Sequence, residues 1–80
     1  MKARVEIFLK PGVLDVQGKA IEAALHGLGF AGVRGVRVGK VITFDLEATD
    51  RAGAELEARR MSETLLANQV IETFHIEIAP

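Results

Sequence analysis

The fold depends on the stretch VRGVRVGKVITFDLE, residues 33–47. Apolar and polar residues alternate on both sides of Gly39-Lys40, which predicts two strands joined by a turn at these residues. A strict two-residue turn would place Val36 and Val38 on the opposite face of the sheet from Ile42, because side chains alternate along a strand. We therefore expect a turn widened to three residues, or a bulge. The alternative is a sheet that is apolar on both faces because its second face is an interface.

Four other segments have a regular pattern. Apolar residues alternate in ARVEIFL, residues 3–9, and in VIETFHIEI, residues 70–78, so both segments predict strands. One helix is expected to begin at Asp15, a good N-cap, and to end at Gly29. A second helix is expected within TDRAGAELEARRMSETLLAN, residues 49–68. The apolar stripes of the two helices are Ala20, Ile21, Ala24, Leu25 and Leu28, and Ala54, Ala58, Met61 and Leu65.

The order of these elements is strand, helix, strand, strand, helix, strand. An antiparallel sheet covered by two helices on one face satisfies this order best. We therefore predict an α+β protein, a ferredoxin-like two-layer sandwich in which residues 1–80 form a single domain. A chain of this size buries only roughly 60–65% of its unfolded surface, so a partner or an oligomer would add stability.

Composition excludes several classes of protein. The net charge of −1 and the absence of Trp and Tyr argue against a nucleic-acid-binding protein. The chain has no cysteine, which excludes disulfides, thiolate metal sites and cysteine nucleophiles. No apolar run is long enough to span a membrane, and the first residues lack the apolar segment of a signal peptide. We therefore expect a cytoplasmic protein without membrane or nucleic-acid partners.

Apolar side chains also fall on the face of the predicted sheet that the helices leave open. Phe8, Val41 and Ile71 lie there among charged residues. In so small a chain, this pattern suggests a homo-oligomer interface in which two sheets meet. For Phe8, the alternative is a single exposed apolar residue, which is common on protein surfaces.

A glycine-containing loop joins the first strand to the first helix, where nucleotide-binding proteins carry a phosphate loop. The stretch is LKPGVLDVQGKAIEAAL, residues 9–25. A Walker A loop has four residues between its glycines and a hydroxyl residue after its lysine. Here five residues separate Gly12 from Gly18, and Ala20 stands in the hydroxyl position. Asp15 would also repel a phosphate, so the loop is not expected to bind one.

The remaining chemistry-bearing residues do not form a catalytic set. His26 lies on a predicted helix and His75 on a predicted strand, and nothing in the sequence forces them together. Ser62 is the only serine and lies within a helix, without a nucleophile elbow or a neighbouring base. No catalytic or metal site is therefore expected, and a binding or assembly module is favoured.

Three blocks of the sequence resemble one family in the right order and spacing. KPGVLDVQGKAIEAAL, VRGVRVGKVITFDLE and LLANQVIETFHIEI are together similar to PurS, the small subunit of phosphoribosylformylglycinamidine (FGAM) synthase. Val16 and Gln69 stand where the family usually has proline. Val16 would be the first helical residue, where proline only pre-organises the backbone, so its absence should cost little.

The resemblance implies a role in de novo purine biosynthesis. The family's small subunit is not itself a catalyst. It joins a large synthetase subunit, which binds ATP, magnesium and formylglycinamide ribonucleotide, to a glutaminase subunit that releases ammonia from glutamine. The assembled enzyme makes formylglycinamidine ribonucleotide. The resemblance also implies homodimers, a further dimer of dimers, and no cofactor in this chain.

The loop before the first helix is then expected to be a docking feature. Its glycines let the backbone approach a partner, and its apolar residues offer anchors. The alternative for Leu14 is a contact with its own helix, and Lys40 is equally well explained as a solvated turn residue. The candidate partner-interface residues are Gly12, Val13, Leu14, Asp15, Gln17, Gly18, Gly39 and Lys40. A functional alternative is a ferredoxin-like regulatory domain that binds a small metabolite at this loop.

Overall fold

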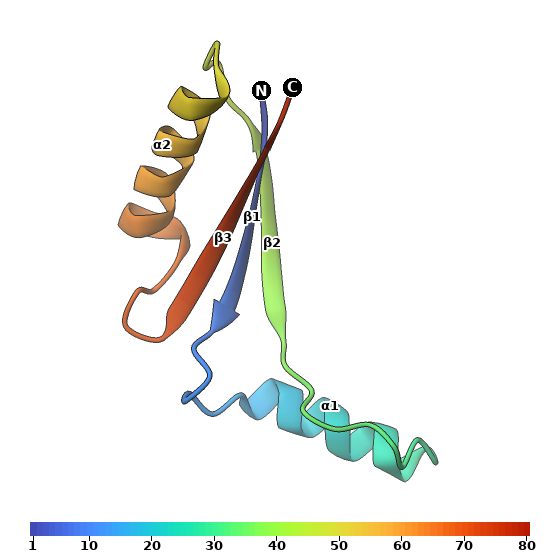
Figure 1. Ribbon diagram of the computed structural model, residues 1–80. Coiled ribbons are helices and arrows are strands. Elements are labelled where there is room, and N and C mark those ends of the chain that lie inside the picture. The colour runs from blue at the N-terminus through green and yellow to red at the C-terminus, as the bar shows by residue number, and fades with distance from the viewer.

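The centre of the molecule is a three-stranded antiparallel sheet, as the computed structural model of residues 1–80 shows (Figure 1). Strand β1 (Lys2–Leu9) lies between β2 (Gly39–Asp45) and β3 (Glu72–Ala79). Both pairings of β1 are antiparallel. The first strand of the chain is therefore the only one with neighbours on both sides, and β2 and β3 are edge strands.

One face of this sheet carries a continuous apolar layer. Ala3, Val5 and Ile7 of β1 are at most 1% exposed. Val5 lies opposite Ile42 of β2 on one side and opposite Ile76 of β3 on the other. Side chains on the same face recur every second residue, so the alternation seen in the sequence produces this layer. The α+β class and the antiparallel sheet are confirmed.

The helix α2 (Arg51–Met61) packs on this layer and contributes to one of the two apolar clusters of the core. Ala54 and Ala58 are fully buried and belong to one apolar cluster with Ala3 and Ile78. Because alanine side chains are short, the helix backbone can lie close to the sheet. The predicted burial of these two alanines is confirmed.

The second helix continues into a π-helical turn, η1 (Ser62–Leu66). The N–H of Ala67 donates to the carbonyl of Ser62, five residues earlier, over 3.0 Å. Ser62 lies four residues after Ala58 and is also fully buried, and the wider turn that follows changes the helical phase, so Leu65 is 81% exposed. The Ser62 hydroxyl donates to the carbonyl of Ala58 at 2.8 Å. The prediction that Leu65 continues the buried stripe is therefore wrong.

The helix α1 (Val16–Gly27) has the predicted ends but lies away from the sheet. Asp15 caps its first turn, and Gly29, with φ of +97°, follows its last. Figure 1 shows α1 beyond one end of the strands, projecting to the side. Ile21 and Leu28 of its apolar stripe are 39% and 74% exposed. The prediction that two helices cover one face is therefore wrong, because α2 alone packs on it.

The predicted hairpin does not form either. Residues 33–38 run back along α1 without joining the sheet, and the chain enters β2 directly at Gly39. The expected strand at 33–38 and the widened turn or bulge at Gly39-Lys40 are both corrected. The physical reason for the missing hairpin is already visible in the sequence, because a tight turn would place Val36 and Val38 on the opposite face of the sheet from Ile42. Since no turn forms, these valines do not have to share a face with Ile42.

These features make the single chain unusually elongated. Its radius of gyration is 16.0 Å, whereas about 12 Å is expected for a compact domain of this length. Only 10 of the 80 residues are buried. The chain by itself therefore has a small core and a large amount of unused apolar surface.

The tight contact beneath α2 generates a stability prediction. Ala58→Leu should lower the free energy of unfolding by about 1–3 kcal/mol, because three extra carbons must enter a filled space. Urea denaturation followed by circular dichroism measures the effect. Ala52→Leu, at an exposed position of the same helix, is the matched control and should change stability little. Equal stability of both variants would show that α2 does not pack through Ala58.

Candidate interaction site

The carboxylate of Asp15 connects the start of α1 to the start of β2. One oxygen accepts a hydrogen bond from the Gly18 N–H at 2.7 Å, and the other accepts from the Val38 N–H at 2.7 Å. Asp15 is only 4% exposed. The N–H groups of Val38 and Gly18, with a smaller contribution from the Arg37 charge, hold the pKa of Asp15 below its ordinary value against the opposing effect of burial.

Two further side chains of α1 bind the segment that returns along the helix. A Glu22 oxygen accepts from the Val36 N–H at 3.1 Å, and this bond is the main cause that lowers the pKa of Glu22. His26 Nε2 lies 2.7 Å from the carbonyl oxygen of Val33. We call α1 and this returning segment, residues 16–38, the arm. Its two halves are joined by side chain to backbone contacts.

Gly18 is required where the two halves of the arm meet. A Cβ atom at this position would overlap the carbonyl oxygen of Val36 and the carboxylate of Asp15. Gly18 is buried and lies in the first turn of α1. Gly18 therefore serves a contact within the chain, and Asp15 uses both of its carboxylate oxygens within the chain.

Arg37 fixes the loop that leads into the arm. Its guanidinium donates to the carbonyl oxygens of Val13 at 3.0 Å and Lys10 at 3.1 Å, with a longer contact to Leu9 at 3.5 Å. The planar fork of arginine suits several acceptors at once. The loop between β1 and α1 is thus held by the residue that lies two positions before β2. No local pattern in the sequence indicates this contact, because the partners lie 24 and 27 residues apart in the chain.

The structure brings the two predicted docking regions to one corner of the molecule. Asp15 and Gln17 line an open cleft of about 450 Å³ together with Gly39 and Lys40. Lys40 Nζ lies 3.9 Å from a carboxylate oxygen of Glu72, so this lysine is paired within the chain.

Leu14, in the same loop, is 68% exposed, which contradicts the alternative that it packs under its own helix. Gly12 is also exposed, and Val13 is half-buried. The middle of the loop is therefore exposed. Its last residue, Asp15, is buried and caps the first turn of α1.

The second face of the sheet carries the other predicted cluster. Phe8 and Val41 lie there and are 43% and 48% exposed, whereas Ile71, which is 38% exposed, lies in the turn just before β3. The ring of Phe8 lies against Gly39, where a Cβ atom would overlap it. Around the cluster, Arg4 lies 3.3 Å from a Glu6 carboxylate oxygen. Apolar and charged groups of both signs thus share this face.

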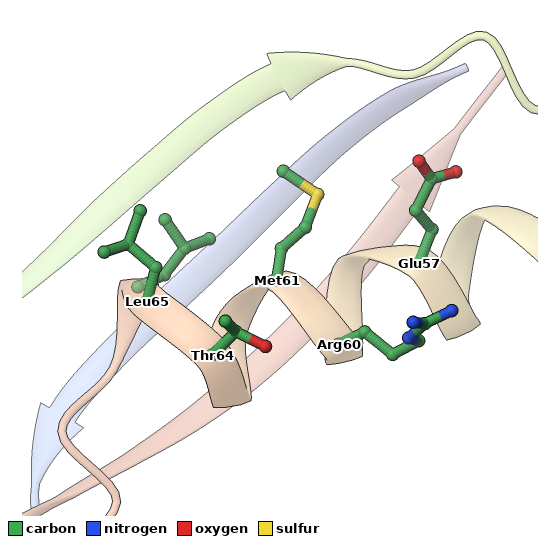
Figure 2. A pocket seen from close by; sticks show the side chains of 6 residues that line it. Glu57, Arg60, Met61, Thr64 and Leu65 are labelled. Atoms are coloured by element: carbon green, nitrogen blue, oxygen red, sulfur yellow. The ribbon is translucent and has the colours of Figure 1, made fainter.

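Sequence reasoning missed a groove beside α2. It has a volume of about 470 Å³ and is lined by Glu57, Arg60, Met61, Thr64, Leu65 and Leu66. Figure 2 shows Glu57, Met61 and Leu65 extending from the same side of the helix. The π-helical turn places Leu65 here, and the helical pattern of the sequence does not reveal such a turn.

The arrangement offers surfaces and no reaction centre. Ser62 is buried and bonded to a backbone carbonyl. His, Asp and Glu side chains do not gather into groups of three or more that could hold a metal ion. No helix is both long and apolar enough to cross a membrane. A small fold with an open groove beside α2 and exposed apolar residues on α1 is typical of an assembly subunit, which contributes surfaces to a larger complex.

Comparison with known proteins identifies which assembly subunit this is. The family model of PurS, described as phosphoribosylformylglycinamidine (FGAM) synthase, matches residues 2–80. The chain is 47% identical over 76 residues to the PurS subunit of FGAM synthase from Archaeoglobus fulgidus, and the alignment covers 95% of each chain. The protein therefore belongs to the PurS family, and the resemblance of the three sequence blocks is confirmed.

Solved structures agree with this assignment. A structure of Bacillus subtilis PurS matches with a TM-score of 0.88 and 39% identity, over 99% of this chain and 98% of that one. A chain in a structure of PurLQS from Thermotoga maritima matches with a TM-score of 0.87 and 28% identity, over 95% of this chain and 93% of that one. These matches favour the assembly subunit over a metabolite-binding regulatory domain.

The lowered pKa of Asp15 generates a pH prediction. A carboxyl group whose pKa is lower in the folded state stabilises that state above its unfolded pKa and loses the contribution as pH falls through its folded pKa. The amide proton resonances of Val38 and Gly18 should therefore shift on acidification with a midpoint below about 3.9, the ordinary value for aspartate.

Two-dimensional NMR of the amide protons, recorded from about pH 6 down to about pH 2, measures this midpoint, because that range brackets the ordinary pKa values of carboxyl groups. In the Asp15→Asn variant the same resonances should not follow that titration. A midpoint at or above the ordinary value would contradict the two hydrogen bonds.

Proposed function

We propose that this chain is the subunit that holds the large synthetase and the glutaminase of FGAM synthase together in purine biosynthesis. The observation that carries the proposal is the family match, which extends over residues 2–80. The matched Thermotoga maritima structure is of PurLQS, a complex that includes the PurS subunit. The chain contributes to a ligase without supplying catalytic residues. Its role is to keep the two larger subunits in register, so that ammonia released from glutamine reaches the synthetase.

The corner formed by the loop before α1 and the start of β2 is the proposed docking surface for a larger subunit. Leu14 is highly exposed there, although a leucine is costly to leave in water. Gly12 beside it leaves the backbone open to close approach. Gln17 and Lys40 add polar groups at the rim of the adjoining cleft.

The proposal places the cofactors on the other subunits. ATP and magnesium bind to the large synthetase, and this chain binds neither. The complex works in the cytoplasm, which is consistent with a chain that contains no cysteine.

Reconstitution tests the function and the docking surface together. Glutamine-dependent synthesis of formylglycinamidine ribonucleotide by the large and glutaminase subunits of the same organism should require this chain, whereas ammonia-dependent synthesis should depend on it less. Leu14→Asp should raise the concentration of chain needed for half-maximal activity about tenfold or more, because a buried charge disfavours docking.

Leu56→Asp is the matched control, since Leu56 is 62% exposed on α2. It should leave this concentration unchanged. Full glutamine-dependent activity without the chain would contradict the function. Equal behaviour of the two variants would contradict only the docking surface.

The chain also assembles with a second copy of itself in this proposal. It has an unfilled groove along α2 and η1, and it has an apolar face on α1 that nothing covers. It also has an edge strand, β2, beside which an extended segment such as residues 33–38 would fit. Two copies can exchange arms, so that each arm fills the groove and edge of the other chain.

A further pairing joins two such dimers through the second face of the sheet. Phe8, Val41 and Ile71 supply its apolar contacts. The face also carries both signs of charge, as in the contacts from Arg4 to Glu6 and to Glu77. Two identical copies related by a two-fold axis can therefore match opposite charges.

Exchange of arms generates a prediction for α1. Ile21→Asp should weaken the dimer by about tenfold or more, because it places a charge on the face that enters the partner's groove. Sedimentation equilibrium over a range of concentrations measures this. Ala23→Asp, at an exposed position on the other side of the same helix, should leave the dimer intact. A dimer that tolerates both changes would exclude this face of α1 from the interface.

A further inference from the structure

Residues 33–47 can be arranged in two ways around Gly39-Lys40. With a turn at Gly39-Lys40, residues 33–38 would pair with β2 of the same chain, and the arm would lie on its own sheet. Without a turn, the arm points away, as observed. In exchange of this kind, the arm packs either on its own chain or on a second copy, so a small local preference at the connection decides between the two forms.

We propose that Asp15 and Arg37 form a clamp that holds the connection between the arm and β2 open, and so directs the arm to a second copy of the chain. The proposal rests on the homodimer described above, and it adds the residues that select the exchanged form. The clamp consists of the contacts from Asp15 to Val38 and from Arg37 to Val13 and Lys10.

The first half of the clamp acts on the chain as it enters β2. The Val38 N–H is bonded to Asp15 at 2.7 Å, and the Val36 N–H is bonded to Glu22 at 3.1 Å. A tight turn would have to redirect this backbone and release both carboxylates. Hydrogen bonds to a charged acceptor are stronger than neutral ones, and the one to Asp15 is largely shielded from water. The turn therefore competes with bonds that are already made.

The second half of the clamp acts on the chain as it leaves β1. Arg37 lies in the segment that enters β2, yet it donates to Val13 and Lys10 in the connection that leaves β1. The two connections that join the arm to the sheet are thus bonded to each other at the base of the arm. This cross-link restricts rotation of the arm about either connection.

The two halves support each other. The positive charge of Arg37 contributes to the lowered pKa of Asp15, so the two side chains also attract. Gly18 allows the arm to close tightly around the Asp15 carboxylate, since any Cβ there would strike both Asp15 and Val36. The clamp therefore uses residues that are already engaged within the chain.

Paired cysteine labels measure the direction of the arm directly, because the chain has no cysteine of its own. Gly32→Cys places a label at the tip of the arm, where a Cβ atom meets nothing within 4 Å. Thr49→Cys places a second label in the exposed loop after β2. With the arm open, the end of the arm remote from the sheet and the loop after β2 lie at opposite ends of the molecule (Figure 1). With a turn at Gly39-Lys40, they would come close together.

Double electron–electron resonance of the doubly labelled chain, diluted into unlabelled chain, reports the distance within one copy. The chain with an intact clamp should show only the long distance. Asp15→Asn combined with Arg37→Ala should add a short distance and raise the dimer dissociation constant about tenfold or more. Arg34→Ala, which removes an exposed arginine from the same segment, is the matched control and should change neither.

Arg37→Lys keeps the charge but loses the fork, and it should give an intermediate result. Because the Arg37 side chain contacts only surface backbone, this variant and Arg37→Ala test the clamp even if the double variant does not fold. An unchanged long distance and an unchanged dissociation constant in the folded clamp variants would overturn the clamp. A monomeric chain with an intact clamp and a long distance would instead overturn the homodimer.

Discussion

The two hydrogen bonds that the Asp15 carboxylate accepts connect α1 to the start of β2, and the position of α1 shapes the rest of the molecule. It binds the first turn of α1 through Gly18 and the start of β2 through Val38. These two bonds join segments that lie 23 residues apart in the sequence. In the structure that contains this joint, α1 lies away from the sheet of its own chain. The exposed groove, the uncovered helix face and the elongated outline all follow from this one placement.

Local patterns in the sequence were sufficient for much of the fold. Alternation placed β1 and the apolar residues of β3, and the cap at Asp15 and the glycine at position 29 gave the ends of α1. The burial of Ala54 and Ala58 also followed from helical spacing. Each of these features depends on residues that are close together in the chain, so a single sequence contains the information.

The predictions from sequence were wrong where contacts that a local sequence pattern does not reveal determine the structure. The phase conflict around Gly39 showed that a tight turn was unfavourable, but only the contacts of Arg37 and Asp15 show that the turn is absent altogether. The exposure of Leu65 depends on the hydrogen bond that spans five residues at the end of the second helix. Of the candidate interface residues, Leu14 has the exposed position that docking needs, whereas Asp15 and Gly18 are used within the chain.

The small number of buried residues has a consequence for how the cell handles this subunit. The single chain buries 10 of its 80 residues, so in the proposed dimer association would add to its stability, and that stability would rise with the concentration of the chain. Under the same proposal, copies made in excess of their partners would have a larger unfolded fraction and would be more open to proteases. The amount of the subunit that survives would then follow the supply of its partners.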